Sequence, residues 1–246
     1  MLTIDSLYDK ITREEGVIMI FEHNGLIFNN ISVSEAKIIG SKNKNIAVLV
    51  CPNVVDKYRV TGIGANAFKN STSLKLVFLP KNVNHIGSEA FSGCVALKGV
   101  LQLCQSHAIE IESGAFFGCS NLSQFSANIA SIGIGAFGNC KALEKIIISP
   151  HCKSIDSFAF FGCKKLHSIY FEGGTWAAPI LEISVDIFLN CPVKYLYSDR
   201  QIKFKYNKLI TKNNYPLPRS VQIMATALSN LNELVVFGYN ILDWKT

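Results

Sequence analysis

The sequence predicts an α/β solenoid of about six coils, with a parallel β-sheet along one face and a cap at each end. Two observations carry this prediction: one phrase of apolar and small residues recurs along most of the chain, and a short strand-like stretch follows each copy. A coil of this size buries its apolar face by stacking on its neighbours. With 49% hydrophobic and 17% charged residues, the 246-residue chain has enough apolar side chains for such a core.

The repeated phrase reads Ile-Gly-x-x-Ala-Phe-x-x-Cys-x-x-Leu, and each copy predicts one coil. Its six copies begin at Ile63, Ile86, Ile111, Ile132, Ile155 and Ile183. The intervals between starts, about 21 to 28 residues, fit the roughly 20 to 29 residues typical of leucine-rich repeats. The longest interval contains an insertion over residues 172–179. The spacing therefore predicts a leucine-rich-repeat array over residues 63–198.

Stacked coils place equivalent side chains in columns, and two columns are visible in the sequence. An aromatic column predicts a continuous core spine: Phe68, Phe91, Phe116, Phe137, Phe160 and Phe188. A second column consists of Cys94, Cys119, Cys140, Cys163 and Cys191, with Ser71 in the first coil. Parallel Cβ vectors on neighbouring coils do not present sulfurs face to face. We therefore expect buried free thiols.

A strand is expected after the leucine of each phrase, and six such strands are expected to form one parallel sheet. They start at Leu74, Leu97, Leu122, Leu143, Leu166 and Val193. Residues three and five places after the leading residue, such as Ile146 and Ile148, are apolar and should point inward. Gln102 departs from this pattern and predicts a β-bulge near residues 100–103.

The repeated phrase, extended by Leu-x-x-Ile-x-Leu-Pro, resembles that of the BspA-type leucine-rich repeat family, found in bacterial and protist proteins, many of them at the cell surface. The resemblance runs from Ile63 to about Ser198, and the segment from Cys51 to Ile63 resembles the opening of such arrays. The strand-end proline is kept only at Pro80 and Pro150. Membership would imply ligand binding and adhesion, without catalysis. The N-terminus lacks the basic and apolar regions of a signal peptide, which favours the cytoplasm, so the location stays open.

The chain is expected to divide into an N-terminal cap (residues 1–62), the repeat array (63–198) and a C-terminal cap (199–246). The N-terminal cap should contain a short helix (Ile4, Leu7, Ile11), a hairpin of strands 17–22 and 26–29 around Asn24-Gly25, and strands at 33–40 and 46–50. The C-terminal cap should contain an amphipathic helix with Val221, Met224, Leu228, Leu231 and Val235 on one face and Gly238 as its C-cap. This helix either packs over the last coil or binds a partner.

No residue pattern points to catalysis, a cofactor or a metal. The stretch 133–138 spells Gly-x-Gly-x-x-Gly, but it falls in the repeat frame with Phe137 in the spine, without the crossover helix of a dinucleotide site. No Cys-x-x-Cys pair or nucleophile motif occurs. The longest apolar runs are far shorter than a membrane span. A formal charge of +6 is a mild excess, without the basic cluster of a nucleic-acid arm.

The outward-facing positions of the expected sheet are the candidate ligand-binding face. They comprise an apolar and aromatic row (Phe78, Leu101, Ile147, Tyr170 and Tyr197, with Ser126 in the third coil) beside Lys75, Lys98, Lys145, His167, Lys194 and Tyr195. Strand propensity alone is one explanation of this row, and a protein or glycan interface is the other. We expect a binding protein in cell-surface adhesion. The alternatives are an intracellular interaction scaffold and, third, an enzyme built on repeats.

Overall fold

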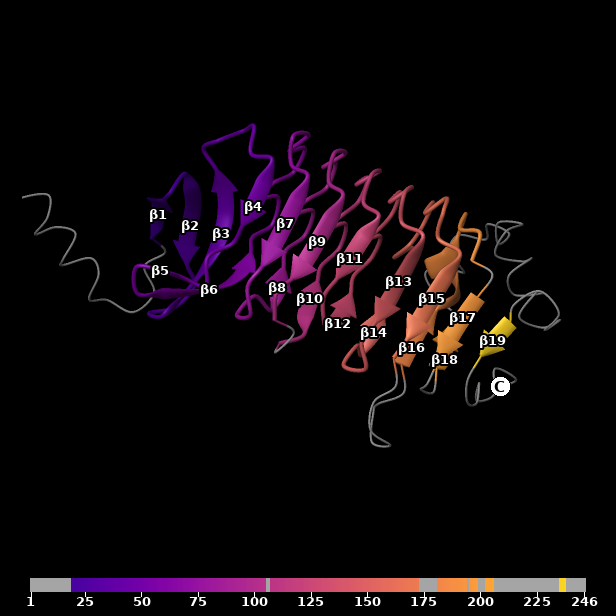
Figure 1. Ribbon diagram of the computed structural model, residues 1–246. Helices are drawn as coiled ribbons and strands as arrows, with labels where there is room; N and C mark the ends of the chain where they lie inside the picture. The colour runs from indigo at the N-terminus through magenta and orange to yellow at the C-terminus, as the bar shows by residue number, and fades with distance from the viewer. Residues whose placement is uncertain are drawn as a thin grey trace, which may run out of the picture.

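The computed structural model describes residues 19–104, 107–172, 181–193, 195–198, 202–205 and 235–237 (Figure 1). Over these ranges the chain winds as a solenoid in which two rows of parallel strands run side by side, and no α-helix occurs in them. Among the described residues, a single 3-10 turn, Val185–Phe188, lies in the coil that begins at Ile183. The expected solenoid of about six coils is therefore confirmed, whereas its helical component is not.

One row of strands forms a sheet along the whole solenoid, in the order β1-β2-β3-β6-β8-β10-β12-β14-β16-β18, with β5 beside β6. Its strands are β1 Ile20–His23, β2 Leu26–Asn30, β3 Glu35–Ser41, β5 Val54–Val55, β6 Tyr58–Ile63, β8 His85–Ile86, β10 Ile109–Ile111, β12 Ile129–Ile132, β14 Ser154–Ile155, β16 Leu181–Ser184 and β18 Ile202–Lys205. From β3 onward all pairs along this path are parallel. Sequence analysis expected the strands of the N-terminal cap but missed those of this sheet from β8 onward, because strands of two to four residues leave little periodicity to detect.

The strands expected after the leucines form two sheets instead of one. The first has the order β11-β9-β7-β4 and the second β13-β15-β17-β19. Their bounds are β4 Val48–Val50, β7 Leu76–Leu79, β9 Gly99–Gln102, β11 Gln124–Ser126, β13 Lys145–Ile148, β15 Ser168–Phe171, β17 Tyr195–Ser198 and β19 Val235–Phe237. The expectation of a single sheet was wrong. No strand pairing joins β11 to β13, and only Ala127 and Asn128 separate β11 from β12.

The phenylalanine column is the core of the solenoid, as expected. Its six side chains are buried, at most 5% exposed. The first five rings stack with centroids 5.3 to 5.6 Å apart and interplanar angles of 4° to 16°. Phe125 of β11 adds edge-on contacts of 5.4 Å to Phe116 and 4.9 Å to Phe137. The repeats are thus held by one continuous apolar column.

The cysteine column lies beside this spine and points at the backbone of the preceding coil. Each thiol donates a hydrogen bond to the carbonyl of the phenylalanine one coil earlier, from Cys94 to Phe68 at 3.0 Å through Cys163 to Phe137 at 3.0 Å. Cys191 makes the same contact with Phe160 at 2.6 Å. The same carbonyls also accept a backbone N–H within their own coil, as Phe68 does from Ser71 at 3.0 Å, so each thiol adds a second hydrogen bond that links two coils.

The bulge expected from Gln102 does not form. Strand β9 pairs with β7 in continuous register, from Leu76 with Gly99 to Leu79 with Gln102. Gln102 points inward and is 7% exposed, and its carboxamide donates to the His107 carbonyl and accepts from the Asn128 N–H, both at 2.9 Å. A buried amide is accommodated in regular strand geometry when its hydrogen bonds are satisfied.

The hairpin at the N-terminal end is confirmed. Strands β1 and β2 are antiparallel, and Asn24 and Gly25 join them with φ angles of 51° and 78°. Strand β3 pairs in parallel with β6, and β4 with β7, so both rows of strands already begin here. The short helix expected around Ile4 to Ile11 lies outside the described residues.

The helical C-terminal cap is not supported. Val235, expected on the apolar face of the helix, begins strand β19, which pairs in parallel with β17. The sequence of β19, Val-Val-Phe, consists of residue types that favour strands over helices. The rest of the expected helix, residues 221–234, and its C-cap Gly238 lie outside the described residues.

Candidate functional site

Strand pairing brings the residues of the expected apolar row into register along the two split sheets. The face of these sheets that carries Phe78, Leu101, Ile147 and Tyr170 is here called the outer face. Strand pairing aligns Val50, Phe78, Leu101 and Ser126 in the first sheet. It aligns Ile147, Tyr170 and Tyr197 in the second. The break between β11 and β13 therefore divides the row into two segments. The inward partners Val77, Leu79, Ile146, Ile148, Ile169 and Phe171 are all buried, as expected.

The side chains of this row are exposed to different degrees. Ile147 and Tyr170 are 47% and 37% exposed, whereas Phe78 and Leu101 are half-buried. The structure adds Val50, 61% exposed, and Val48, 45% exposed, at the N-terminal end. Sequence analysis missed these valines because it placed their strand in the cap. The uninterrupted apolar run of residues 46–50, which a strand with only one buried face does not need, was the available signal.

The basic residues expected beside the row do not form one line. Lys75, Lys98 and His167 are exposed and occupy equivalent places just before their strands. Lys145 is exposed within β13, where pairing aligns it with Ser168 and, through β15, with Tyr195 of β17. Lys194 lies outside the described residues.

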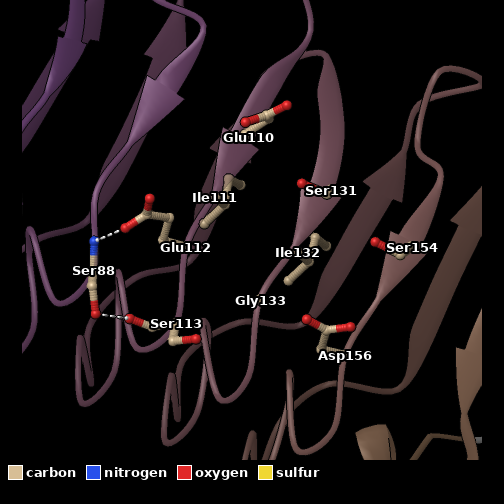
Figure 2. A pocket seen from close by; sticks show the side chains of 10 residues that line it. All are labelled: Ser88, Glu110, Ile111, Glu112, Ser113, Ser131, Ile132, Gly133, Ser154 and Asp156. Carbon is tan, nitrogen blue, oxygen red and sulfur yellow. Dashed lines mark hydrogen bonds between the residues drawn. The ribbon is translucent and has the colours of Figure 1, made fainter.

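A hollow of about 280 Å³ lies on the other row of strands and was not foreseen (Figure 2). It spans strands β10, β12 and β14 and is lined by Ser88, Glu110, Ile111, Glu112, Ser113, Ser131, Ile132, Gly133, Ser154 and Asp156. Glu110 and Glu112 flank Ile111, and Asp156 lies across the hollow beyond Gly133. The carboxylates on both sides of Ile111 were the signal available in the sequence. Gly133 is required at its floor, because a Cβ there would lie 2.7 Å from the Ser113 nitrogen.

The carboxylates of this hollow differ in their surroundings. Glu112 accepts hydrogen bonds of 2.7 Å from His85 Nε2 and from the Ser88 N–H. Partial burial acts to raise the pKa of Glu112, but these two hydrogen bonds, together with the charges of His85 and Lys37, hold the pKa below its usual value. Partial burial raises the pKa of Asp156. The lining thus offers carboxylate and hydroxyl oxygens and no cationic side chain.

Neither surface has the features of a metal or cofactor site. Among the residues that the structure describes, no group of three or more His, Cys, Asp or Glu side chains is placed to hold a metal ion. The glycine-rich stretch 133–138 follows β12 and leads into a turn, with Phe137 in the spine. No helix in the described ranges is long and apolar enough to cross a membrane.

Comparisons with known proteins agree with this architecture. A family model described as BspA type leucine rich repeat region matches in six copies, over residues 42–125 and 101–215. No curated protein sequence matches the chain significantly. The chain is similar to the solved structure of a T. pallidum leucine rich repeat protein, with 21% identity, a TM-score of 0.64, and coverage of 94% of this chain and 100% of that chain.

A leucine rich cell surface protein from Faecalibacterium prausnitzii is also similar. Its identity is 23% and its TM-score 0.60, with coverage of 74% of this chain and 49% of that chain. The chain therefore matches about half the length of the F. prausnitzii protein. At these identities, both likenesses support the fold alone.

Proposed function

The chain belongs to the BspA-type leucine-rich repeat family, and from this premise we propose that it is a non-enzymatic binding protein whose outer face engages a protein or glycan partner. The observation that carries the proposal is the row of exposed apolar side chains, above all Val50, Ile147 and Tyr170. Apolar surface that is contiguous and exposed in a folded protein commonly marks a partner site.

Strand propensity does not account for this row by itself. The neighbouring column of the same strands contains Gly99, Gln124, Lys145 and Ser168 beside Leu76, so these strands form with small or polar residues at several of these positions. Exposed apolar residues are therefore not needed for strand formation here. Tyrosine at the centre of an interface can contribute about 2 kcal/mol or more to binding, which makes Tyr170 the strongest single anchor.

We propose adhesion at the cell surface as the setting of this binding. Supporting it, the F. prausnitzii relative is described as a cell surface protein. Protease treatment of intact cells that carry the tagged full-length protein tests this: loss of the tag signal is expected. Complete protection in intact cells, with digestion after lysis, would instead favour an intracellular interaction scaffold.

The binding proposal is tested on the row itself. A partner is first isolated on the immobilised full chain and identified by mass spectrometry. The variant Ile147→Ser/Tyr170→Ser should then raise the Kd for that partner by about 100-fold or more, because two anchors are lost. The matched control Val33→Ser/Val54→Ser alters two valines that are 84% and 51% exposed and lie away from the outer face. It should change the Kd by less than about threefold.

Circular dichroism and thermal unfolding must show that both variants remain folded. Equal weakening by the two variants, or no weakening by Ile147→Ser/Tyr170→Ser, would contradict the proposal and place the binding site elsewhere.

A further inference from the structure

The edge of the outer face where the strands begin is strongly basic. We define the lysine rim by five segments, one in each of five described coils. Each segment consists of the five residues that follow Ser71, Cys94, Cys119, Cys140 or Cys163. The rim contains the lysines Lys75, Lys98, Lys141, Lys145, Lys164 and Lys165 and a single acidic residue, Glu144. Its formal charge of +5, from six lysines and one glutamate, nearly equals the +6 of the entire chain.

The lysines of the rim are exposed, and most lack an ionic partner. Lys165 pairs with Glu144 at 3.6 Å, and the other five make no ion pair with a described carboxylate. The backbone N–H of Lys98 donates to the Lys75 carbonyl at 2.8 Å, so these two lysines lie on adjacent coils. Like charges on neighbouring strands repel each other and destabilise the fold slightly.

Three cations outside the rim, in contrast, pair with carboxylates on neighbouring strands or coils. Lys69 pairs with Glu89, Lys42 with Glu22, and Arg59 with Glu35 at 2.9 Å. Other exposed lysines outside the rim, such as Lys57 and Lys153, form no ion pair with a described carboxylate, so the rim differs by the number of lysines gathered on one edge.

The opposite charge gathers on the other row of strands. The hollow in Figure 2 carries Glu110, Glu112 and Asp156 and has no lysine or arginine in its lining. The solenoid thus separates its charges: basic where the outer-face strands begin, acidic over β10 to β14. Such separation attracts and orients a charged partner before contact.

We propose that the partner of the outer face is an acidic polypeptide, which places apolar side chains on the Val50 to Tyr170 row and carboxylates over the lysine rim. This inference rests on the proposed function of that face. A polyanion such as a sulfated glycan would compensate the lysines but leave Ile147 and Tyr170 uncovered. A wholly apolar partner would cover the row but desolvate lysines without compensation, which is costly. Only a partner with both features complements the two neighbouring surfaces.

Three probes test the proposal against the full chain: a 12-residue peptide that alternates glutamate with leucine or valine, its analogue with lysine for glutamate, and heparin. We expect the acidic peptide to bind at least about tenfold more tightly than either other probe. Its affinity should fall as the salt concentration is raised from about 50 to 300 mM. Surface plasmon resonance gives the association and dissociation rates separately.

A variant with two reversed charges tests whether the lysine rim contributes to binding. The variant Lys75→Glu/Lys98→Glu should lower the affinity for the acidic peptide by about tenfold or more, mainly through a slower association rate. The matched control Lys57→Glu/Lys153→Glu reverses two exposed lysines beside the other row of strands and changes the net charge by the same amount. It should change the Kd by less than about threefold.

Four outcomes would overturn the inference: stronger binding of the lysine peptide, stronger binding of heparin, equal effects of the two reversals, or no effect of the rim reversal. If Ile147→Ser/Tyr170→Ser weakens binding of the isolated partner while the rim reversal does not, the inference fails and the proposed function stands. If neither variant weakens that binding, both fail.

Discussion

Gln102 and Asn128 are joined across 26 residues of chain by a hydrogen bond of 2.9 Å, from the Asn128 backbone N–H to the side-chain Oε1 of Gln102. The same carboxamide donates to the His107 carbonyl at 2.9 Å. Equivalent positions of other coils hold apolar residues, namely Leu79 and Ile148. The buried side chain of Gln102 therefore links the connection after β9, which contains His107, to the connection after β11, which contains Asn128.

Replacing Gln102 with leucine, the residue type at position 79, should destabilise the protein despite its greater hydrophobicity. The His107 carbonyl and the Asn128 N–H would each lose a hydrogen bond, which costs about 1–3 kcal/mol in a buried setting. Urea denaturation measures the free energy of unfolding. Ile148→Leu, a volume-conserving change in the same column, is the control and should cost less than about 1.5 kcal/mol. A Gln102→Leu variant as stable as the parent would show that the carboxamide contributes nothing.

Phe137→Ser should come close to unfolding the protein. Phe137 is fully buried and its ring lies 5.3 Å from Phe116, 5.6 Å from Phe160 and 4.9 Å from Phe125. Large-to-small changes at such sites cost roughly 3–5 kcal/mol, much of the stability of a typical domain. Phe117→Ser, at a ring that is 42% exposed, is the control and should cost much less. A melting temperature of Phe137→Ser within about one or two degrees of the parent would contradict the burial of the column.

The column thiols should react with iodoacetamide only after denaturation, whereas Cys104 should react in the folded protein. Cys94, Cys119, Cys140 and Cys163 are fully buried and Cys104 is exposed. Burial also raises the pKa of Cys140, and it raises the pKa of Cys51 to about 12, so the reactive thiolate is scarce at neutral pH. Intact-mass spectrometry with and without denaturant counts the labels. Labelling of Cys140 in the folded protein, or disulfides between successive column cysteines, would refute this expectation.

Asp156→Asn should be more heat-stable than the parent at pH 7, by about 1–2 °C. Partial burial raises the pKa of Asp156 above its ordinary value of 3.8, so the folded state holds this proton more tightly than the unfolded state does. The charged carboxylate therefore costs stability above the folded pKa, and the cost fades as the pH falls through that pKa toward 3.8. The difference in melting temperature should disappear near pH 3.8. Glu172→Gln, at an exposed carboxylate outside the hollow, should show no such convergence.

The sequence by itself determined the stacking of this protein. A phrase that returns every 21 to 28 residues, with Phe in every copy and Cys in all but the first at the same places, forces those side chains into columns once the coils pack on each other. The burial of Phe137, the inward direction of Ile146 and Ile148, and the turn at Asn24-Gly25 follow from such local and repeated patterns. All of them are confirmed by the structure.

Only the tertiary structure decided how the coils hydrogen-bond to one another. Gln102 is polar, yet it lies in a regular strand because its partner Asn128 is supplied one coil later. Phe125 turns edge-on to the spine, and the expected sheet is divided between β11 and β13. The separation of the lysine rim from the acidic hollow also emerges only when the coils are stacked. These features depend on neighbours 20 or more residues away, whose positions no local pattern specifies.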